Sequence, residues 1–362
     1  MNLRKTALHS LHQQLGGRMV EFAGWSMPVQ YAGTLKEHQA VRQSVGIFDV
    51  SHMGEIEITG PEALQAAQRL TCNDLTRIED GQAQYSAFLT PEGTFVDDIV
   101  VYRFSTRRIF ICVNAANRDK DFKWVSEHLS GEAEASDVGD FYSQFAIQGP
   151  RSEDVLQRLT ASDLSAIRYY RFQVGQVDGV DAIISRTGYT GEAGFEIYLD
   201  PRHSEQVFRA LLKAGEGEDI QPAGLAARNT LRLEVCFPLY GNDIDSTTTP
   251  LEAGLGWIAK LESDDFIGRE ALRRQKEEGL ERKLIAFEMV DRGIARDGYP
   301  VILEGQEVGR VRSGSYGPTV EKNIGLTYLP LEAAQEGRSF EIEIRGRRAA
   351  AKVVAKPFYK KD

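Results

Sequence analysis

Two adjacent carboxylates, Asp97 and Asp98, lie in the middle of an apolar stretch at residues 93–103, GTFVDDIVVYR. The β-branched and aromatic residues of this stretch predict a strand, and the two-residue period of a strand turns neighbouring side chains to opposite faces. A strand that is apolar on both faces is normally buried, and a buried carboxylate without partners is unfavourable. Two interpretations are therefore open: the end of the strand is solvated, or one carboxylate lines a pocket.

A third carboxylate, Glu196, follows the glycine-rich stretch at residues 188–194 and alternates with Phe195 and Ile197 along another expected strand. A glycine turn can bring the backbone close to a ligand, and a carboxylate accepts two parallel donors, which suits a ring edge of the amidine type. Arg228, on an expected helix, is suited to anchor the carboxylate of a ligand. The simpler interpretation of both charged residues is exposure on the surface of a strand and of a helix.

Two asparagines, Asn114 and Asn117, end another expected strand in the stretch VNAAN. Either amide could bind a ligand or cap the helix that is expected from Arg118, and capping is the expectation for Asn117. The sequence has no dinucleotide-binding GxGxxG after a strand, no P-loop, no HExxH and no GxSxG. Its six histidines are scattered, and its three cysteines lack metal-ligand spacing. The chemistry must therefore use carboxylates and a reactive small molecule, without a metal.

The composition is that of an ordinary globular protein. The 362 residues predict two or three domains, with 42% hydrophobic and 27% charged residues. A net charge of -10 argues against a nucleic-acid or membrane-surface binder, although a local basic pocket for an anionic ligand is compatible with it. The few, widely spaced cysteines, the lack of a signal-peptide core and the lack of a transmembrane-length apolar run favour a cytoplasmic protein.

The elements that must position these residues follow from periodicity and turn signals. Helices are expected at 6–15 and 34–44, a strand at 54–58, and a packed loop at 22–31, where Gly24 and Pro28 interrupt regular structure. A further helix is expected from Pro222 to 235. The charged helix at 263–283 is a plausible linker, and the short strands from 283 onward indicate a small all-β barrel or sandwich.

The first part of the chain contains an internal repeat. Ile58-Thr-Gly-Pro leads to Gln68-Arg-Leu-Thr and Asp74-Leu, and Ile147-Gln-Gly-Pro leads to Gln157-Arg-Leu-Thr and Asp163-Leu at the same offsets. Pro61 and Pro150 are expected in the first turn of a helix. DIVVYR at 98–103 is similar to DAIISR at 181–186, and IFICVN at 109–114 to FEIYLD at 195–200. We infer two duplicated α+β units, at about 58–129 and 147–215.

Six stretches, in order, resemble the aminomethyltransferase (T-protein) family of the glycine cleavage system: FAGWSMPVQY, GIFDVSHMGE, DDIVVY, GYTGEAGFEI, GLAARNTLRLE and LYGNDID. The resemblance runs from about residue 6 to the C-terminal KPF. It implies a three-domain cloverleaf around a tetrahydrofolate site. Its parts are two related α+β subdomains with mostly antiparallel sheets, within residues 1–270, and a C-terminal all-β barrel domain at 283–362.

The resemblance also implies a reaction and a partner. The one-carbon unit of an aminomethyl group, carried on the lipoyl arm of H-protein, passes to tetrahydrofolate. The products are 5,10-methylenetetrahydrofolate, ammonia and dihydrolipoyl H-protein. A fixed carboxylate near the reacting carbon would stabilise the positive charge that develops there and could relay a proton. No metal, nucleic acid or membrane is involved.

The functional residues of the family transfer where its motifs match. The second aspartate of the doublet, Asp98, corresponds to the catalytic residue, and Glu196 to the residue that contacts the pterin. The arginine of GLAAR is Arg228. The resemblance further assigns pocket-wall or polar-contact positions to Met53, Tyr189 and Asn114. The last contact of the family, near the C-terminus, does not transfer to this short tail, so Tyr359 is left unassigned.

Other functions on the same fold are less compatible with the sequence. Related folate-binding proteins that assist iron–sulfur assembly or transfer-RNA modification carry a cysteine where Gly188 stands here. A folate-dependent demethylase would leave the acidic doublet without its aminomethyl role. Flavin-dependent fusions need a nucleotide-binding domain that this chain does not contain. A non-enzymatic interaction protein would not bind tetrahydrofolate.

Overall fold

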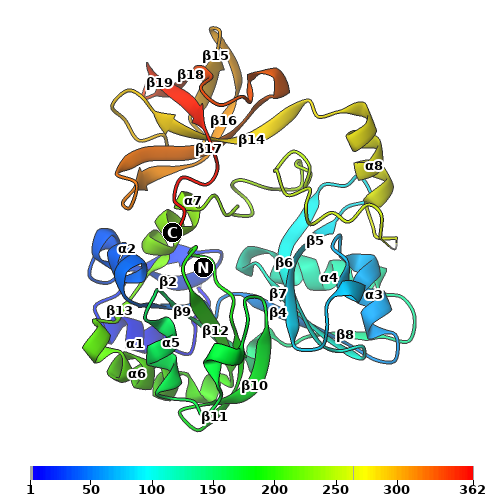
Figure 1. Ribbon diagram of the computed structural model, residues 1–362, viewed down its shortest axis with the longest axis vertical. Coiled ribbons are helices and arrows are strands. Elements are labelled where there is room, and N and C mark those ends of the chain that lie inside the picture. The colour runs from blue at the N-terminus through cyan, green and yellow to red at the C-terminus, as the bar shows by residue number, and fades with distance from the viewer. Residues whose placement is uncertain (1–2, 264, 362) are drawn as a thin grey trace. The chain divides into compact units, whose positions relative to one another are not determined.

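The computed structural model describes residues 3–263 and 265–361 (Figure 1). The chain forms two compact units, each assembled from several stretches of sequence. The first unit comprises Met1–Leu70, Asp74–Ser86 and Ile99–Asn229, and the second comprises Thr71–Asn73, Ala87–Asp98 and Thr230–Asp362.

A six-stranded sheet organises much of the first unit. Its order is β10 (Phe172–Val177), β11 (Val180–Ser185), β12 (Gly194–Leu199), β9 (Ser143–Gln148), β3 (Gly46–Asp49) and β13 (Gln221–Pro222). Neighbouring strands are antiparallel except β3 and β13. One face buries Phe195 and Ile197 together with residues of helices α1 (His9–Gln14), α5 (Ser152–Gln157) and α6 (Ser204–Ala214). Because side chains alternate, Glu196 and Tyr198 occupy the opposite face.

A five-stranded sheet has the order β5 (Gln82–Leu89), β6 (Phe95–Ser105), β7 (Arg108–Val113), β4 (Gly54–Thr59) and β8 (Glu134–Asp137). Helices α3 (Ala63–Leu70) and α4 (Arg118–His128) lie beside this sheet (Figure 1). The order β5-β6-β7-β4 is the same as the order β10-β11-β12-β9 in the other sheet. The two sheets thus share one strand topology.

The residues of the sequence repeat have equivalent contacts in its two copies. Gln68 Oε1 accepts a hydrogen bond from the backbone N–H of Leu75 at 2.6 Å, and Gln157 Oε1 accepts one from that of Leu164 at 3.1 Å. The aspartate that precedes each leucine caps the short 3-10 turn that follows. The repeated motif therefore encodes a helix-to-turn connection that is stabilised by side chain to backbone hydrogen bonds.

A closed barrel forms the C-terminal part of the second unit (Figure 1). Its order is β14 (Arg282–Met289), β17 (Lys322–Pro330), β16 (Gln306–Gly317), β15 (Pro300–Leu303), β18 (Ser339–Ile344) and β19 (Arg347–Val354). Phe287, Val301 and Ile342 contribute to its core. Helix α8 (Arg269–Glu278) precedes the barrel. The predicted class, α+β with mostly antiparallel sheets and a C-terminal barrel, is confirmed.

The predicted loop at 22–31 is wrong, because most of it forms an antiparallel hairpin of β1 (Arg18–Phe22) and β2 (Trp25–Gln30). Ala23 and Gly24 have positive φ angles of 51° and 82°, so the glycine supports the tight turn rather than ending regular structure. Pro28 is tolerated because the sheet has only two strands, and a proline at such an edge need not donate to a further strand.

Two helix starts also differ from the sequence-based prediction. Helix α7 spans Leu225–Glu234 and does not begin at Pro222, because Gln221–Pro222 pairs with β3 instead. Pro61 and Pro150 lie in turns that precede α3 and α5, not inside their first turns. Helix α2 (Thr34–Gln43) lies within the predicted 34–44 helix.

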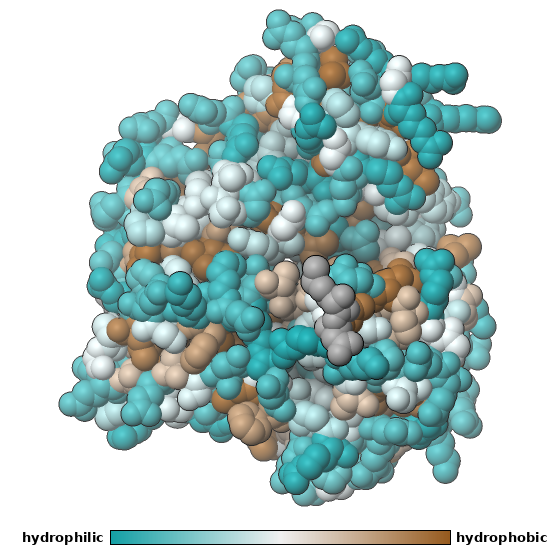
Figure 2. Space-filling model, turned by 180° about the vertical axis from the view of Figure 1, so that it is seen from behind, coloured by the Kyte–Doolittle hydropathy of each residue, from teal (hydrophilic) through white to brown (hydrophobic). Residues whose placement is uncertain are grey.

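One face of the molecule is mostly hydrophilic. On the face that Figure 2 shows, hydrophilic residues predominate and hydrophobic residues lie among them in small groups. Scattered exposed hydrophobic side chains are normal in soluble proteins. Among the described residues, no helix is long and apolar enough to cross a membrane.

Candidate functional site

Glu196 is a buried carboxylate on β12 whose two oxygens both have partners. Gln144 Nε2 donates to Glu196 Oε1 at 3.1 Å, and Thr187 Oγ1 donates to Glu196 Oε2 at 2.6 Å. The strand alternation predicted for this residue is confirmed, because Phe195 and Ile197 pack into the core on the other face. The alternative of a solvent-exposed glutamate is therefore wrong for Glu196.

The partners of Glu196 belong to a larger buried polar network. The second N–H of Gln144 donates to Tyr198 Oη at 3.0 Å, and Tyr198 Oη lies 2.9 Å from Tyr102 Oη. Tyr102 Oη lies 3.5 Å from Thr187 Oγ1, which closes the set into a ring around the carboxylate. Fully satisfied buried networks hold their members in one arrangement. The site therefore presents Glu196 in a fixed orientation.

Burial dominates the electrostatics of this carboxylate. It raises the pKa of Glu196 above its ordinary value, and the hydrogen bond from Thr187, the charge of Arg228 and the hydrogen bond from Gln144 oppose the shift. A ligand that donates hydrogen bonds or brings positive charge would favour the ionised form further. The carboxylate is thus suited to bind a donor-rich ring.

Arg228 lies one turn into α7 with its guanidinium against an aromatic ring. Its Cζ is 4.5 Å from the centroid of the Tyr189 ring, a cation–π contact. The guanidinium forms no ion pair with any residue that the structure describes, although it is half-buried. Most arginines that are removed from solvent form an ion pair. Because Arg228 does not, its guanidinium keeps hydrogen-bonding capacity for an anionic ligand.

His52 lies beside this arginine and is held neutral. Burial first, and then the charge of Arg228, lower the pKa of His52 to about 4, while Asp49 acts in the opposite direction. Its Nδ1 is buried and has no hydrogen-bond partner among the described residues. The ring makes an edge contact with Phe22, 5.6 Å between centroids. At neutral pH His52 therefore adds no positive charge near Arg228.

Met53 and Asn114 are both half-buried. Met53 packs against the hydrophobic cluster that contains Tyr102 and Tyr198, and so lies close to the network around Glu196. Asn114 follows β7 and precedes a 3-10 turn that its side chain does not cap. Asn117 stands at the N-cap of α4 but makes no capping side-chain hydrogen bond, so the predicted cap is wrong.

The two aspartates of the doublet lie on β6 in different surroundings. Asp97 is fully buried, whereas Asp98 is half-buried. By strand alternation Asp98 shares its face with Val100 and Tyr102, and Asp97 shares the other with Ile99. Both aspartates belong to the second compact unit, whereas Glu196 belongs to the first.

Known protein families and known relatives match nearly the whole length of the chain. The family models described as the GCVT N-terminal domain and the glycine cleavage T-protein C-terminal barrel domain match residues 8–263 and 282–360. An aminomethyltransferase of Desulfitobacterium hafniense (strain Y51) is 50% identical, and one of Halalkalibacterium halodurans is 45% identical, each alignment covering 99% of both chains. The crystal structure of the glycine cleavage system aminomethyltransferase T from Bartonella henselae is 31% identical, covers 99% of both chains and superposes with a TM-score of 0.93.

The chain belongs to the glycine cleavage T-protein family. The predicted family and the predicted enzyme class, a transferase, are confirmed. Aminomethyltransferases of this family transfer the one-carbon unit of an aminomethyl group on H-protein to tetrahydrofolate. Within the described residues of this T-protein family member, no group of three or more His, Cys, Asp or Glu side chains could hold a metal ion.

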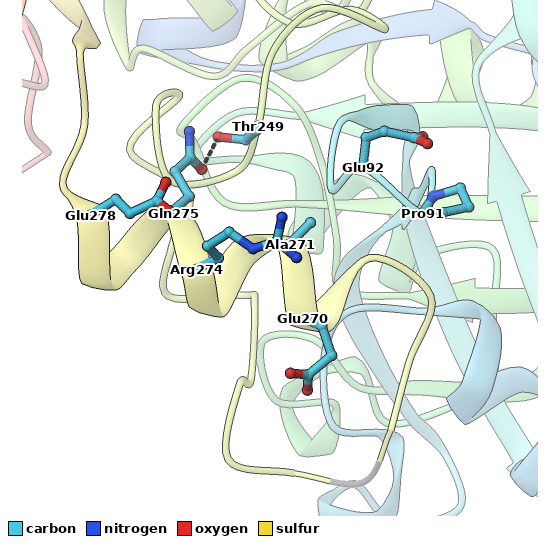
Figure 3. A pocket seen from close by; sticks show the side chains of 8 residues that line it. All are labelled: Pro91, Glu92, Thr249, Glu270, Ala271, Arg274, Gln275 and Glu278. Atoms are coloured by element: carbon cyan, nitrogen blue, oxygen red, sulfur yellow. Dashed lines mark hydrogen bonds between the residues drawn. The ribbon is translucent and has the colours of Figure 1, made fainter.

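The second unit has a surface pocket of about 420 Å³. Its lining comes from α8 and from two loops, and Thr249 Oγ1 donates to Gln275 Oε1 at 2.8 Å within it (Figure 3). None of the site residues that the T-protein resemblance predicts lines this pocket. Among its charged side chains, Arg274 and Glu278 belong to α8, whereas Glu92 belongs to the loop between β5 and β6 (Figure 3).

Sequence reasoning missed several members of the T-protein network. Gln144, Thr187 and Tyr198 carried no motif that marks a site, and Tyr102 was counted only as an apolar strand residue. Gln144 meets Glu196 because β9 pairs with β12 in a register that sets Ala146 opposite Glu196. This register is a property of the three-dimensional sheet. The local sequence gives no signal for Gln144, because SQFAIQ, at 143–148, does not alternate between polar and apolar residues.

Proposed function

We propose that this chain uses tetrahydrofolate as the acceptor and lipoylated H-protein as the donor of the one-carbon unit. The products are 5,10-methylenetetrahydrofolate, ammonia and dihydrolipoyl H-protein. Membership of the family supports this reaction. One observation carries the assignment. The buried Glu196 carboxylate and Arg228 lie in the same compact unit and interact through their charges. Arg228 nevertheless forms no ion pair in the described part of the chain, so it can bind an anionic ligand.

We propose that Glu196 holds the pterin ring of the folate. A carboxylate offers about four lone-pair positions, and Gln144 and Thr187 occupy one on each oxygen. Each oxygen can therefore accept a further hydrogen bond from a ring N–H group. Because the carboxylate is buried, such charge-assisted hydrogen bonds would be stronger than at an exposed site.

The remaining binding roles follow from charge and shape. Arg228 would pair with an anionic group of the folate, and its contact with Tyr189 keeps the guanidinium plane fixed while leaving its N–H groups available. Tyr189 and Met53 would contribute to the pocket wall. Asn114 would supply a polar contact at the end of β7.

We propose Asp98 as the catalytic carboxylate. The one-carbon unit passes at the formaldehyde level, so positive charge develops on the carbon as the bond to the leaving ammonia breaks. A carboxylate fixed near that carbon stabilises this charge and can accept or relay a proton. Asp97, which is fully buried on the opposite face of the strand, is expected to serve structure instead.

The partner and the domain boundaries are part of the same proposal. A lipoylated H-protein would deliver its arm to the folate-binding region, residues 1–270, and residues 283–362 would form a separate barrel domain. Limited proteolysis would then cut preferentially in the joining segment, 263–283, or in the loop at 241–250. The three cysteines are widely spaced in sequence and form no disulfide among the described residues, which supports a reducing compartment, the cytoplasm.

The reaction can be tested by product analysis. The chain, aminomethylated H-protein and tetrahydrofolate are mixed, and methylenetetrahydrofolate and ammonia are measured together. We expect both products in equal amounts, and neither when H-protein carries no aminomethyl group. Ammonia released at the same rate without tetrahydrofolate, or no methylenetetrahydrofolate in the full mixture, would contradict the proposed acceptor.

A further inference from the structure

Helix α2 carries two buried charged side chains that the proposed reaction does not use. The side chain of Glu37 is inaccessible to solvent, and that of Arg42 is 5% exposed. Burying a charge is unfavourable unless it is paired and hydrogen-bonded, so such residues mark a structural or functional requirement. Both form contacts with segments far away in sequence.

Glu37 fixes the start of helix α7. Its Oε2 accepts from the backbone N–H of Gly224 at 2.9 Å, and its Oε1 accepts from those of Tyr31 and Gly33 at 2.6 and 2.9 Å. Gly224 directly precedes α7, and its carbonyl accepts from the backbone N–H of Arg228 at 3.1 Å. A carboxylate at this position satisfies a free N–H group and interacts favourably with the helix dipole.

The backbone at Gly224 is packed so closely against β2 that a side chain would not fit there. A Cβ there would lie 2.5 Å from the carbonyl carbon and oxygen of Val29 on β2. The preceding residue, Ala223, donates its backbone N–H to the carbonyl of Ile47 at 2.9 Å. The first turn of α7 is therefore held by β2, by β3 and by Glu37, which determines where Arg228, one turn further on, projects.

Arg42 fixes the loop that carries Tyr189. Its Nη1 donates to the carbonyl of Thr190 at 2.6 Å and pairs with Glu192 Oε1 at 3.2 Å. From the sheet side, Gln148 Oε1 accepts from Thr190 Oγ1 at 2.9 Å. Thr190 is thus held on two sides, by its carbonyl and by its hydroxyl, directly beside Tyr189.

We propose that Glu37 and Arg42 are positioning residues that set the geometry of the Arg228–Tyr189 pair and thereby the affinity for the folate. Glu37 acts on Arg228 through the first turn of α7, and Arg42 acts on Tyr189 through Thr190. This inference rests on the proposed function, because it assumes that the pair contacts the acceptor. Neither side chain needs to touch the ligand or the reacting atoms.

The test compares Glu37→Gln and Arg42→Lys with the wild-type chain. Glu37→Gln places an amide N–H group against backbone N–H donors. Arg42→Lys replaces the rigid guanidinium, whose Nη1 contacts both Thr190 and Glu192, with an ammonium on a flexible stem. For each variant we expect KM and Kd for tetrahydrofolate to rise about tenfold or more, with kcat within about threefold, the pattern of lost binding rather than lost chemistry. A change in kcat alone would overturn the proposal.

A matched control and a double-variant cycle separate positioning from general destabilisation. Val41→Ala removes a buried side chain from the same helix and should lower the unfolding midpoint while leaving KM within about twofold. In a Tyr189→Leu background, Arg42→Lys should change Kd by less than about twofold, because its effect passes through Tyr189. An equal effect of Arg42→Lys in both backgrounds would contradict this route.

The positioning role of Glu37 can also be tested in the protein without ligand, independently of tetrahydrofolate binding. The charge of Arg228 acts on His52, so the titration of the His52 ring, followed by NMR, reports where the guanidinium lies. Glu37→Gln should move this titration, and Val41→Ala should not. Failure of the wild-type chain to bind tetrahydrofolate would refute the proposed function. An unmoved His52 titration in Glu37→Gln would refute the positioning role independently.

Discussion

The guanidinium of Arg228 lies over the ring of Tyr189, with Cζ 4.5 Å from the ring centroid, and these two residues come from different elements of the same compact unit. The contact orients the guanidinium without neutralising it. Because a ring face offers no carboxylate, the positive charge of Arg228 remains available to a ligand. The pair therefore combines fixed geometry with unused binding capacity.

Replacing Glu196 tests the proposed pterin contact. Glu196→Gln removes the negative charge and puts an amide N–H group where Gln144 or Thr187 now donates. We expect tetrahydrofolate binding to weaken by about 1.5–3 kcal/mol, the range for a hydrogen bond to a charged group. Calorimetric titration measures this loss. Glu205→Gln, a change at an exposed position on α6, is the control, and equal affinity of both variants would remove Glu196 from the site.

The neutral state of His52 predicts a specific pH dependence. Its folded pKa, about 4, lies below the ordinary 6.5, so the unfolded chain binds a proton that the folded chain does not. The contribution to stability is therefore complete above pH 6.5 and is lost as the pH falls towards about 4. NMR titration of the ring should give a midpoint near 4 that moves up in Arg228→Met. A midpoint near 6.5 in the wild-type chain would contradict the burial of His52.

A buried carboxylate on β4, Glu55, should limit stability at neutral pH. Burial raises the pKa of Glu55 well above its ordinary value, and its Oε2 has no hydrogen-bond partner among the described residues. The unfolded chain then loses its proton first, so stability falls as the pH rises from about 4.5 through the folded pKa. Glu55→Gln should unfold at a higher temperature than the wild-type chain at pH 8, with little difference at pH 4. If the two unfolding temperatures differed by the same amount at pH 4 and at pH 8, the prediction would be wrong.

A buried ion pair in the second unit should dominate its local stability. Arg232 pairs with Asp243, both side chains are at most 1% exposed, and Arg232 Nη2 also donates to Ser313 Oγ at 2.8 Å. Asp243→Ala would leave a buried guanidinium without its counter-charge, which destabilises by about 3–5 kcal/mol. Denaturant unfolding measures the loss. The double variant Arg232→Met, Asp243→Leu should recover most of it, and a single variant as stable as wild type would show that the pair is dispensable.

The sequence allowed correct prediction where a side chain obeys a local period. Alternation along one strand was enough to place Glu196 opposite Phe195 and Ile197, and the turn signals after residue 283 were enough to predict an all-β barrel or sandwich. The hairpin at 18–30 was missed because Gly24 and Pro28 suggest a loop unless one knows that the sheet has only two strands. Local signals are ambiguous when their meaning depends on a partner strand.

The contacts of the candidate site could not be predicted from local sequence patterns. Gln144 reaches Glu196 through the register of β9 with β12, and Glu37 reaches Gly224 across 187 residues of sequence. Neither contact produces a periodic pattern in the sequence. The roles of Asp98, Met53 and Tyr189 came from the family resemblance, whereas Glu196, Arg228 and Asn114 were also candidates by residue type and position. All six stay predictions until the variants are assayed.

Asp98→Asn is the decisive variant for the chemistry, because it keeps the size of the side chain and removes its charge. If Asp98 stabilises the developing positive charge or relays a proton, turnover should fall by roughly 10²–10⁴-fold, the range for a positioned acid–base group. Affinity for tetrahydrofolate should change much less, since the interaction is made in the transition state. Asp97→Asn, at the fully buried neighbour, should reduce stability more than rate.

The most direct measurement is the single-turnover rate of methylenetetrahydrofolate formation from aminomethylated H-protein at saturating tetrahydrofolate, for wild type, Asp98→Asn and Asp97→Asn in parallel. We predict rapid formation by wild type, a rate at least about 10²-fold lower for Asp98→Asn, and a near wild-type rate for folded Asp97→Asn. An Asp98→Asn variant that forms product as fast as wild type would contradict the proposed role of Asp98, and no product from the wild-type chain would contradict the proposed reaction itself.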